Sequence, residues 1–253
     1  MPPFENVVGK KFVNVTPEEK TCGMRSLTHY CIQTHGIYRE CDDCDDSLPD
    51  KRHPPEYLTD IHTDFNQTWW QSVTMLEFND VRFQEVNLTV NLGKAYDITY
   101  VRLKFHSPRP ASFAIYKKSR RSPAEADPYP EEDWIPWQYY SATCRDTYGM
   151  PESDSIIQPR DGKTKINEDR ALCTSDFSDM TPLTGGNVAF STLGGRPSAY
   201  NFEYSPELQS WVSATDIRIS LKRINSFGDE FFWDHKVLRS YYYAIMDFTV
   251  GGT

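Results

Sequence analysis

Alternating apolar and polar positions dominate the chain from residue 86 onward. In "EVNLTVNLG" the apolar residues stand two apart, and "ITYVRLKF", "SFAIYKK" and "TDIRISLKR" repeat the alternation. A period of two is typical of β-strands that bury one face. "NVAFST" indicates another short strand. "YYYAIMDFTV" is apolar at nearly every position, so we expect a strand buried on both faces.

Glycine and proline turns separate these segments, and short strands at regular spacing predict an all-β fold, an antiparallel β-sandwich. A length of 253 residues is compatible with one all-β domain. We therefore predict a single domain, 1–253, with an irregular cap at 1–70 and the sandwich at 71–253. Two polar segments that contain proline, 120–133 and 151–170, are expected to be long surface loops.

Composition narrows the function. Aromatic residues make up 14% of the chain, enough to fill a sizeable core. The net charge of -9 argues against a nucleic-acid partner, because phosphate binding needs clustered Lys and Arg. There is no apolar run of about 18 residues, so we expect no membrane insertion. No signal peptide stands at the start, where the sequence reads "MPPF".

Six cysteines and three sequons indicate an oxidising, secreted environment. The cysteines are Cys22, Cys31, Cys41, Cys44, Cys144 and Cys173, and the sequons, which predict N-linked glycans, are at Asn14, Asn66 and Asn87. "CDDC" resembles half of a zinc site, but no second such pair exists, so disulfides are favoured. Cys144 and Cys173 bracket a polar loop and are expected to pair. The other four leave three pairings open.

Catalytic patterns are missing. The chain contains no G-x-S-x-G, Walker A, H-E-x-x-H or G-x-G-x-x-G motif, and its histidines show no metal-ligand spacing. We therefore expect no enzyme, although the many carboxylates leave a glycosidase pair as a remote alternative. One loop, "YLTDIHTDFNQTWW", offers Asp60 and Thr68 as oxygen donors. Calcium takes six to eight oxygen ligands, and such a loop is a candidate site.

Longer motifs carry a family resemblance. "TWWQS", "LGKAYDITYVRLKFHSPRPASFAIYK", "WIPWQYYSATC", "PLTGGNVAFSTLGGRPSAYNF", "NSFGDE" and "YYYAIMDFTVGG" occur in this order. Together they closely resemble the laminin N-terminal (LN) domain of laminin short arms and netrins, from about Phe4 to Gly252. The chain is most similar to laminin γ chains, because the cysteines that netrins carry at the positions of Trp69 and His106 are missing. Residues 120–133 are longer than is usual in the family.

The resemblance implies a jelly-roll sandwich without enzymatic activity, in a protein secreted to the extracellular matrix of basement membranes. It implies calcium-dependent association with the LN domains of laminin α and β chains into ternary nodes of a polymer. It also implies one structural calcium ion, held by the side chains of Asp60 and Thr68 and the backbone carbonyls of Tyr57 and Met246. Two family cysteines usually precede the "PPFEN" segment, so we expect an incomplete N-terminus.

Two further hypotheses concern surfaces. Jelly rolls often carry lectin sites, so a carbohydrate- or receptor-binding module is the alternative function. Trp134, Trp137, Tyr139 and Tyr140 would stack on sugars in that case, although core packing explains them more simply. "PLTGGNVAFSTLGGRPSAYNF" is a candidate assembly surface, but tight turns explain its Gly and Pro content equally well. Thr68 serves both a sequon and the predicted calcium site, so Asn87 is the better glycosylation candidate than Asn66.

Overall fold

The computed structural model describes residues 5–32, 39–61, 67–78, 84–119, 134–157, 166–226, 228 and 234–253. The predicted sequon at Asn66 and the predicted loop 120–133 lie outside this range. Within it, the strands are β1 (Glu5–Asn6), β2 (Val13–Thr16), β3 (Thr28–Ile32), β4 (Glu40–Cys44), β5 (Trp70–Gln71), β6 (Val86–Phe105), β7 (Ser112–Lys118), β8 (Ile135–Ser141), β9 (Leu172–Thr174), β10 (Asn187–Ser191), β11 (Ser213–Arg223) and β12 (Ala244–Gly252).

Helices are short and connect the strands. The α-helices are α1 (Cys144–Tyr148), α2 (Pro206–Val212) and α3 (His235–Leu238), and the 3₁₀ helices are η1 (Glu18–Lys20), η2 (Pro55–Leu58), η3 (Met75–Glu77) and η5 (Pro197–Tyr204). α2 begins where Ser205 accepts a hydrogen bond from the amide of Leu208, with Pro206 in the first turn, a favourable start for a helix. In the part of the chain described, no helix is long and apolar enough to cross a bilayer.

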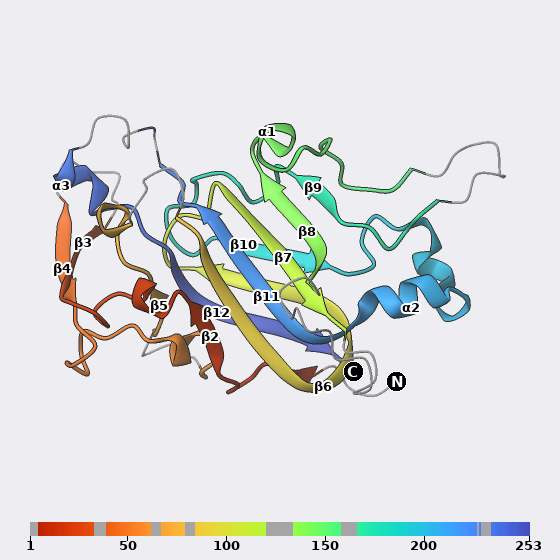
Figure 1. Ribbon diagram of the computed structural model, residues 1–253, viewed down its shortest axis with the longest axis horizontal. Coiled ribbons are helices and arrows are strands. Elements are labelled where there is room, and N and C mark those ends of the chain that lie inside the picture. The colour runs from red at the N-terminus through yellow and green to blue at the C-terminus, as the bar shows by residue number, and fades with distance from the viewer. Residues whose placement is uncertain are drawn as a thin grey trace.

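β6 is shared by both sheets of a β-sandwich (Figure 1). Its first part, from Val86 to Asn91, pairs with β2 and β11, and β11 continues the sheet through β7, β8 and β9. Its last part, from Ile98 to Phe105, pairs with β10 and β12 in the other sheet. Gly93 adopts φ +84°, a conformation that favours glycine, where the pairing of β6 with β11 is irregular between Asn91 and Tyr96.

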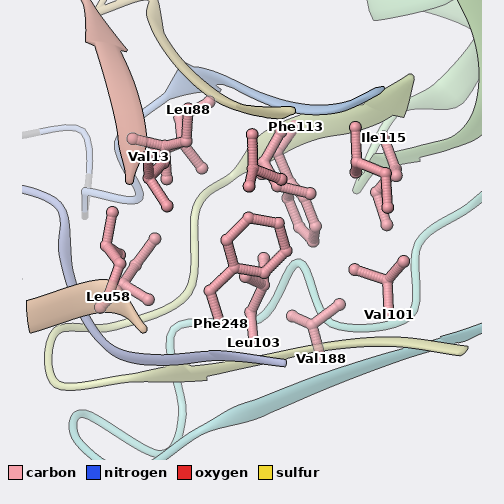
Figure 2. Packing of buried hydrophobic residues seen from close by; sticks show 14 of the residues in the cluster. Val13, Leu58, Leu88, Val101, Leu103, Phe113, Ile115, Val188 and Phe248 are labelled. Carbon is pink, nitrogen blue, oxygen red and sulfur yellow. The ribbon is translucent and has the colours of Figure 1, made fainter. Parts of the chain in front are cut away.

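The core lies between the two sheets (Figure 2). Alternate residues of β6, β7 and β11 face it from one side, and residues of β6, β10 and β12 face it from the other. Fully buried examples are Leu88, Phe113, Ile115, Leu103, Val188 and Phe248. The alternation seen in the sequence therefore positions this core, and the predicted all-β sandwich is confirmed. One pair departs from the antiparallel expectation, because β8 and β9 run parallel.

The N-terminal segment is divided between the sandwich and a separate unit. β1 pairs with β12, and β2 pairs with β6, so residues 5–16 belong to the sandwich and not to the irregular cap expected at 1–70. The reason is that Val13 and Val15 are buried against the core. The separate unit is the β3–β4 hairpin, which pairs with no other strand in the described chain. We call this hairpin the cap hairpin; it lies at the far end from α2 (Figure 1).

Two of the disulfides involve the cap hairpin, and the third lies in the sandwich. Cys31 and Cys41 face each other across the cap hairpin and are bonded, and Cys22 is bonded to Cys44. Cys144 is bonded to Cys173, the pairing favoured by their positions in the sequence, and this bond joins α1 to β9. No described cysteine is free.

Candidate functional site

The candidate calcium loop lies where the chain leaves the cap and enters the sandwich. β5 pairs with the first residues of β12, with Trp70 opposite Ile245. The amide of Ser72 donates to the carbonyl of Tyr243, at 2.8 Å, and the amide of Tyr243 donates to the hydroxyl of Ser72, at 2.9 Å. The two residues of β5 and this reciprocal pair therefore hold the candidate calcium loop to the sandwich. We call this junction, between Trp70–Ser72 and Tyr243–Ile245, the seam.

Two of the predicted calcium ligands, Asp60 and Thr68, are in contact beside the seam. The hydroxyl of Thr68 donates to a carboxylate oxygen of Asp60 at 2.7 Å, although the two residues are eight positions apart. Tyr57 lies in η2, which packs against β12, the strand that contains Met246. Nearby, the hydroxyl of Thr59 donates to the carbonyl of Lys11 at 2.7 Å, which ties this loop to the start of β2.

Met246 occupies a special backbone position. Ile245 is opposite Phe105 and Asp247 is opposite Lys104, so Met246 is an extra residue in β12 and forms a β-bulge. A bulge interrupts the hydrogen-bond ladder and redirects the backbone groups of the extra residue. The irregularity therefore falls at the residue whose carbonyl is a predicted calcium ligand.

These donors suit a hard cation. A carboxylate, a hydroxyl and backbone carbonyls are the oxygen ligands that calcium prefers. Among the described residues no three His, Cys, Asp or Glu side chains cluster as metal ligands. Of the predicted ligands only Asp60 is a carboxylate, so this set of donors differs from the acidic clusters that mark many metal sites. The residues present therefore fit a calcium ion held largely by neutral oxygens.

Trp69 and Trp70 have different environments. Trp70 is fully buried, and its indole nitrogen donates to the hydroxyl of Thr21 at 3.0 Å. Trp69 is half-buried between two imidazoles, with ring centroids 4.2 Å from His53 and 4.0 Å from His106. The planes are nearly parallel, at 19° and 18°. Trp69 and His106, the two positions at which the resemblance implies cysteines in netrins, are in stacking contact here.

The imidazoles of this stack are poorly suited to carry charge. Burial lowers the pKa of His53 to about 4, and burial also lowers the pKa of His106. Both rings are therefore neutral at physiological pH, and stacking on an indole stabilises them by about 0.5–1.5 kcal/mol for each pair. Sequence reasoning treated these histidines as scattered, since nothing in their spacing shows that Trp69 lies between them.

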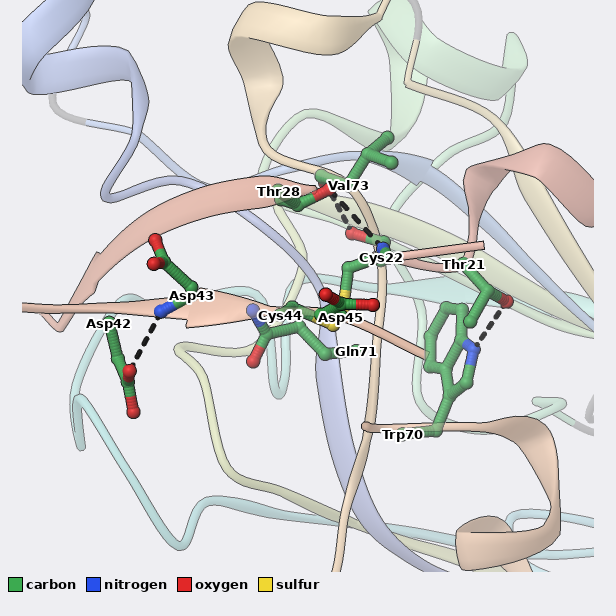
Figure 3. The surroundings of a disulfide bond; sticks show 12 residues. Thr21, Cys22, Thr28, Asp42, Asp43, Cys44, Asp45, Trp70, Gln71 and Val73 are labelled. Atoms are coloured by element: carbon green, nitrogen blue, oxygen red, sulfur yellow. Dashed lines mark hydrogen bonds between the residues drawn. A yellow bond between two sulfur atoms is a disulfide. The ribbon is translucent and has the colours of Figure 1, made fainter. Parts of the chain in front are cut away.

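The Cys22–Cys44 disulfide ties the cap hairpin to the seam (Figure 3). The amide of Cys22 donates to the carbonyl of Gln71 at 3.0 Å, and the amide of Val73 donates to the carbonyl of Lys20 at 2.8 Å. Cys44 is fully buried in a small cluster with Tyr30, Tyr242 and Ala244. This cluster is separate from the main core, so the cap hairpin has only a small apolar contact with the sandwich.

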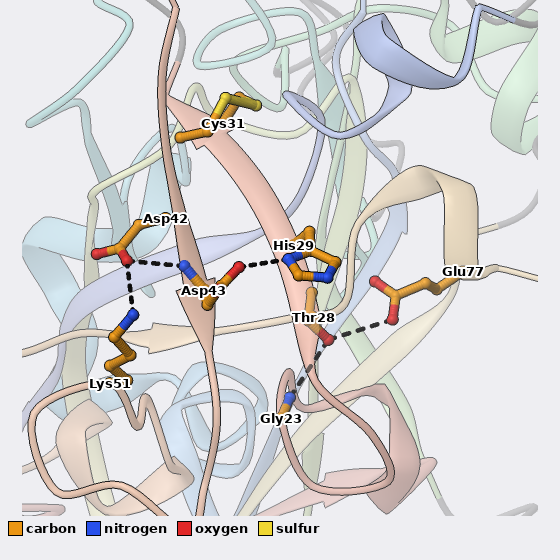
Figure 4. A network of polar contacts seen from close by, with 9 residues as sticks. Gly23, Thr28, His29, Cys31, Asp42, Asp43, Lys51 and Glu77 are labelled. Atoms are coloured by element: carbon orange, nitrogen blue, oxygen red, sulfur yellow. Dashed lines mark hydrogen bonds and ion pairs between the residues drawn. A yellow bond between two sulfur atoms is a disulfide. The ribbon is translucent and has the colours of Figure 1, made fainter.

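Polar contacts lie on both sides of the cap hairpin (Figure 4). His29 pairs with Asp43 across the strands, and Lys51 lies 3.3 Å from the carboxylate of Asp42. The amide of Asp43 donates to Asp42 and, with Lys51, lowers the pKa of that carboxyl group. These groups are largely exposed. Asp42 and Asp43 therefore form local contacts and are not set as a pair around a substrate.

Two sequons lie side by side on adjacent strands. Asn14 is opposite Thr89, and Asn87 is opposite Thr16, so each asparagine faces the hydroxyl residue of the other sequon. Asn14 is exposed and Asn87 is half-buried on the same outer face of the sheet. Glycosylation at these positions remains a prediction.

The aromatic residues proposed for sugar binding are mostly engaged in packing. Trp137 and Tyr140 are buried in the core, with 0% and 2% of their surface exposed. Tyr139 packs against Tyr148, with ring centroids 4.5 Å apart. The guanidinium of Arg218 lies 4.2 Å from the ring centre of Trp134. This geometry offers no open aromatic platform and does not favour the carbohydrate-binding alternative.

Comparison with known proteins identifies the family. The laminin N-terminal (Domain VI) family matches residues 1–252. The chain belongs to this family. It is 51% identical to laminin subunit gamma-1 of Homo sapiens and 52% identical to laminin subunit gamma-3 of Mus musculus, in both cases over 100% of its length. Laminin-like protein lam-2 of Caenorhabditis elegans is 50% identical over the same span. This LN domain is thus similar to those of laminin γ subunits.

The chain spans 14% of the human gamma-1 subunit and 15% of the mouse gamma-3 subunit. Among solved structures, it is similar to chitosan-binding module 1 of a chitosanase/glucanase from Paenibacillus sp. IK-5. That match has 11% identity and a TM-score of 0.42, and covers 97% of this chain and 98% of the module. Such a likeness says nothing about ligands.

Proposed function

We propose that this LN domain is a non-enzymatic assembly module, secreted to the extracellular matrix of basement membranes. In this role it associates with the LN domains of laminin α and β chains, and the three domains form a node of a polymer. The observation that supports the proposal is the full-length similarity to laminin γ subunits, at 51% and 52% identity. Each contact is weak alone, and the many arms of the polymer raise the effective concentration.

A structural calcium ion is part of the proposal. Asp60 and Thr68 would hold it with their side chains, and Tyr57 and Met246 would supply backbone carbonyls. The 2.7 Å approach of Asp60 and Thr68 and the bulge at Met246 support this assignment. When bound, the ion would supply positive charge that attracts oxygen atoms of the loop after η2 and of β12, and so would link the two segments. The protein groups orient oxygen atoms toward it and fix the seam.

Analytical ultracentrifugation tests the assembly role. The domain is mixed with α and β LN domains, first in calcium and then with a chelator. We expect a heterocomplex that forms in calcium and dissociates in chelator. Monomers that persist in calcium at high protein concentration would contradict the proposal.

A second experiment tests the calcium ligands. Binding stabilises a folded protein by about 2.7 kcal/mol when the free ion is at 100 times its dissociation constant. We therefore expect calcium to raise the thermal midpoint of the wild-type domain, and Asp60→Asn to abolish most of that rise. Asp146→Asn, at an exposed position of α1, is the matched control and should keep it. An unchanged calcium response in Asp60→Asn would disprove the assignment.

A further inference from the structure

The end of the sandwich that carries α2 has an unusual surface. The three most exposed large hydrophobic side chains of the described residues are found there: Tyr200 at 99%, Tyr204 at 86% and Ile157 at 83%. Tyr200 and Tyr204 lie on η5, directly before α2. Ile157 follows Ile156, whose amide donates to the carbonyl of Gly195 at 2.8 Å. Side chains so exposed contribute nothing to the core.

A buried polar network holds these tyrosines in place. Arg196 is 4% exposed, and its guanidinium donates to the carbonyls of Glu168, Thr192 and Arg170, at 2.7, 3.0 and 3.2 Å. It also lies 4.3 Å from the ring centre of Trp211. The carboxylate of Glu168 accepts bonds from the hydroxyl and the amide of Ser198, at 2.7 and 3.0 Å. The start of η5 is therefore fixed to the rest of the domain.

The other end of the segment is fixed as well. The amide of Glu168 donates to the carboxylate of Glu207 at 2.7 Å, and the side chain of Gln209 donates to the carbonyl of Glu203 at 2.9 Å. Lys117 is buried and donates to the carbonyls of Ser210, Trp211 and Ser213 at the end of α2. A rigid segment loses little conformational entropy when a partner binds to it.

Carboxylates line part of the described surface beside the tyrosines. An open hollow lies next to α2, and its lining residues in the described chain are Ile166, Asn167, Asp169, Pro206 and Glu207. Two of these are carboxylates and none is basic, and Glu203 is exposed between Tyr200 and Tyr204 along η5. Exposed aromatic rings and nearby carboxylates both favour a positively charged group, by cation–π and ionic contact.

We propose that this surface, made of Tyr200, Tyr204, Ile157, Asp169 and Glu207, binds a basic side chain of another LN domain of a different chain. The inference rests on the proposed function, because this is the surface by which the domain would join the node. In a closed node of three unlike domains, each domain contacts two others, so each needs two separate surfaces. The α2 end and the seam with its cap hairpin lie at opposite ends of the sandwich, which meets this need (Figure 1).

Binding measurements on surface variants test the inference. We compare the wild-type domain with Tyr200→Ala/Tyr204→Ala and with Asp169→Lys, each mixed with α or β LN domains in calcium. Both variants should weaken the affinity for one of the two partners about tenfold or more. Because ionic contact is screened by salt, the wild-type affinity for that partner should also fall as salt is raised.

Controls separate this surface from the fold and from calcium. Asp146→Lys reverses another exposed acid, on α1, and should bind like wild type. The tyrosine variant should keep the wild-type thermal midpoint and its calcium response, because its side chains are exposed and distant from the seam.

The outcomes are distinct. If wild type binds its partners and both surface variants bind equally well, this surface is wrong while the assembly role stands. If wild type binds neither partner, the assembly role fails and the surface assignment fails with it. If the variants instead lose only self-association of this chain, the occupant is a second copy, and the proposed heterotypic partner is wrong.

Discussion

The sandwich and the cap hairpin reach order by different means. The sandwich has a continuous core between two sheets, and many of its apolar side chains are fully buried. The cap hairpin has two disulfides and a small cluster of Tyr30, Cys22, Cys44, Tyr242 and Ala244. A short two-stranded hairpin is marginal by itself, so it needs these covalent bonds. The sandwich is therefore stabilised mainly by burial of apolar side chains, and the cap hairpin mainly by covalent cross-links.

The largest expected effect comes from the sandwich core. Phe248 is fully buried between the sheets, and Phe248→Ala leaves a cavity that costs about 3–5 kcal/mol. We expect the urea midpoint of the whole domain to fall accordingly. Phe12→Ala, at a side chain 66% exposed, serves as the control and should change the free energy of unfolding by less than about 0.5 kcal/mol. Equal effects of the two variants would contradict the position of the core.

The second largest effect distinguishes the stability of the cap hairpin from that of the sandwich. Cys22→Ser with Cys44→Ser opens a loop of 22 residues and should cost about 3 kcal/mol in the chain-entropy account. We expect this loss to be local. Amide hydrogen exchange should become fast in β3 and β4 while β6 and β11 stay protected. Uniform loss of protection would show that the cap hairpin and the sandwich unfold as one unit.

The smallest effect concerns the seam and depends on pH. The pKa of His53 is 6.5 when unfolded and about 4 when folded, so between these values the unfolded chain binds more protons. The contribution of neutral His53 to the free energy of unfolding is therefore fully present above pH 6.5 and is lost as the pH falls toward 4. We expect a loss of about 2 kcal/mol from pH 7 to pH 5, measured by urea unfolding.

The matched variant for this prediction is His53→Phe, which keeps an aromatic ring against Trp69 but cannot take up a proton. It should lose most of this pH dependence while the stack is preserved. Burial also lowers the pKa of His106, so His106 contributes in the same direction. An identical pH profile in wild type and variant would show that His53 is not the titrating group.

Sequence patterns predicted the sandwich well, for a clear physical reason. β7 and β11 bury one face, and the two-residue period of their apolar positions records this directly. β1 and β2 escaped notice because two and four residues are too few to show a period. The pairing of Cys144 with Cys173 followed from their separation from the other cysteines.

The seam was less predictable, because its features depend on tertiary contacts. The positions of Asp60 and Thr68 suggested oxygen donors, but their 2.7 Å contact depends on how the loop folds back. The bulge at Met246 arises from the register of β12 against β6, which no local pattern encodes. The stack of His53, Trp69 and His106 likewise joins residues from three separate segments.

The shared strand β6 also determines when the domain can fold during synthesis. β6 is complete at residue 105, yet its partners β10, β11 and β12 lie between residues 187 and 252. Contacts between residues so distant in sequence make folding slow, and unpaired apolar strands are prone to aggregate while they wait. During synthesis of this domain, β6 therefore has only β2 as a partner until β10 emerges, and the sheet that contains β11 can be completed at residue 223, before the sheet that contains β12.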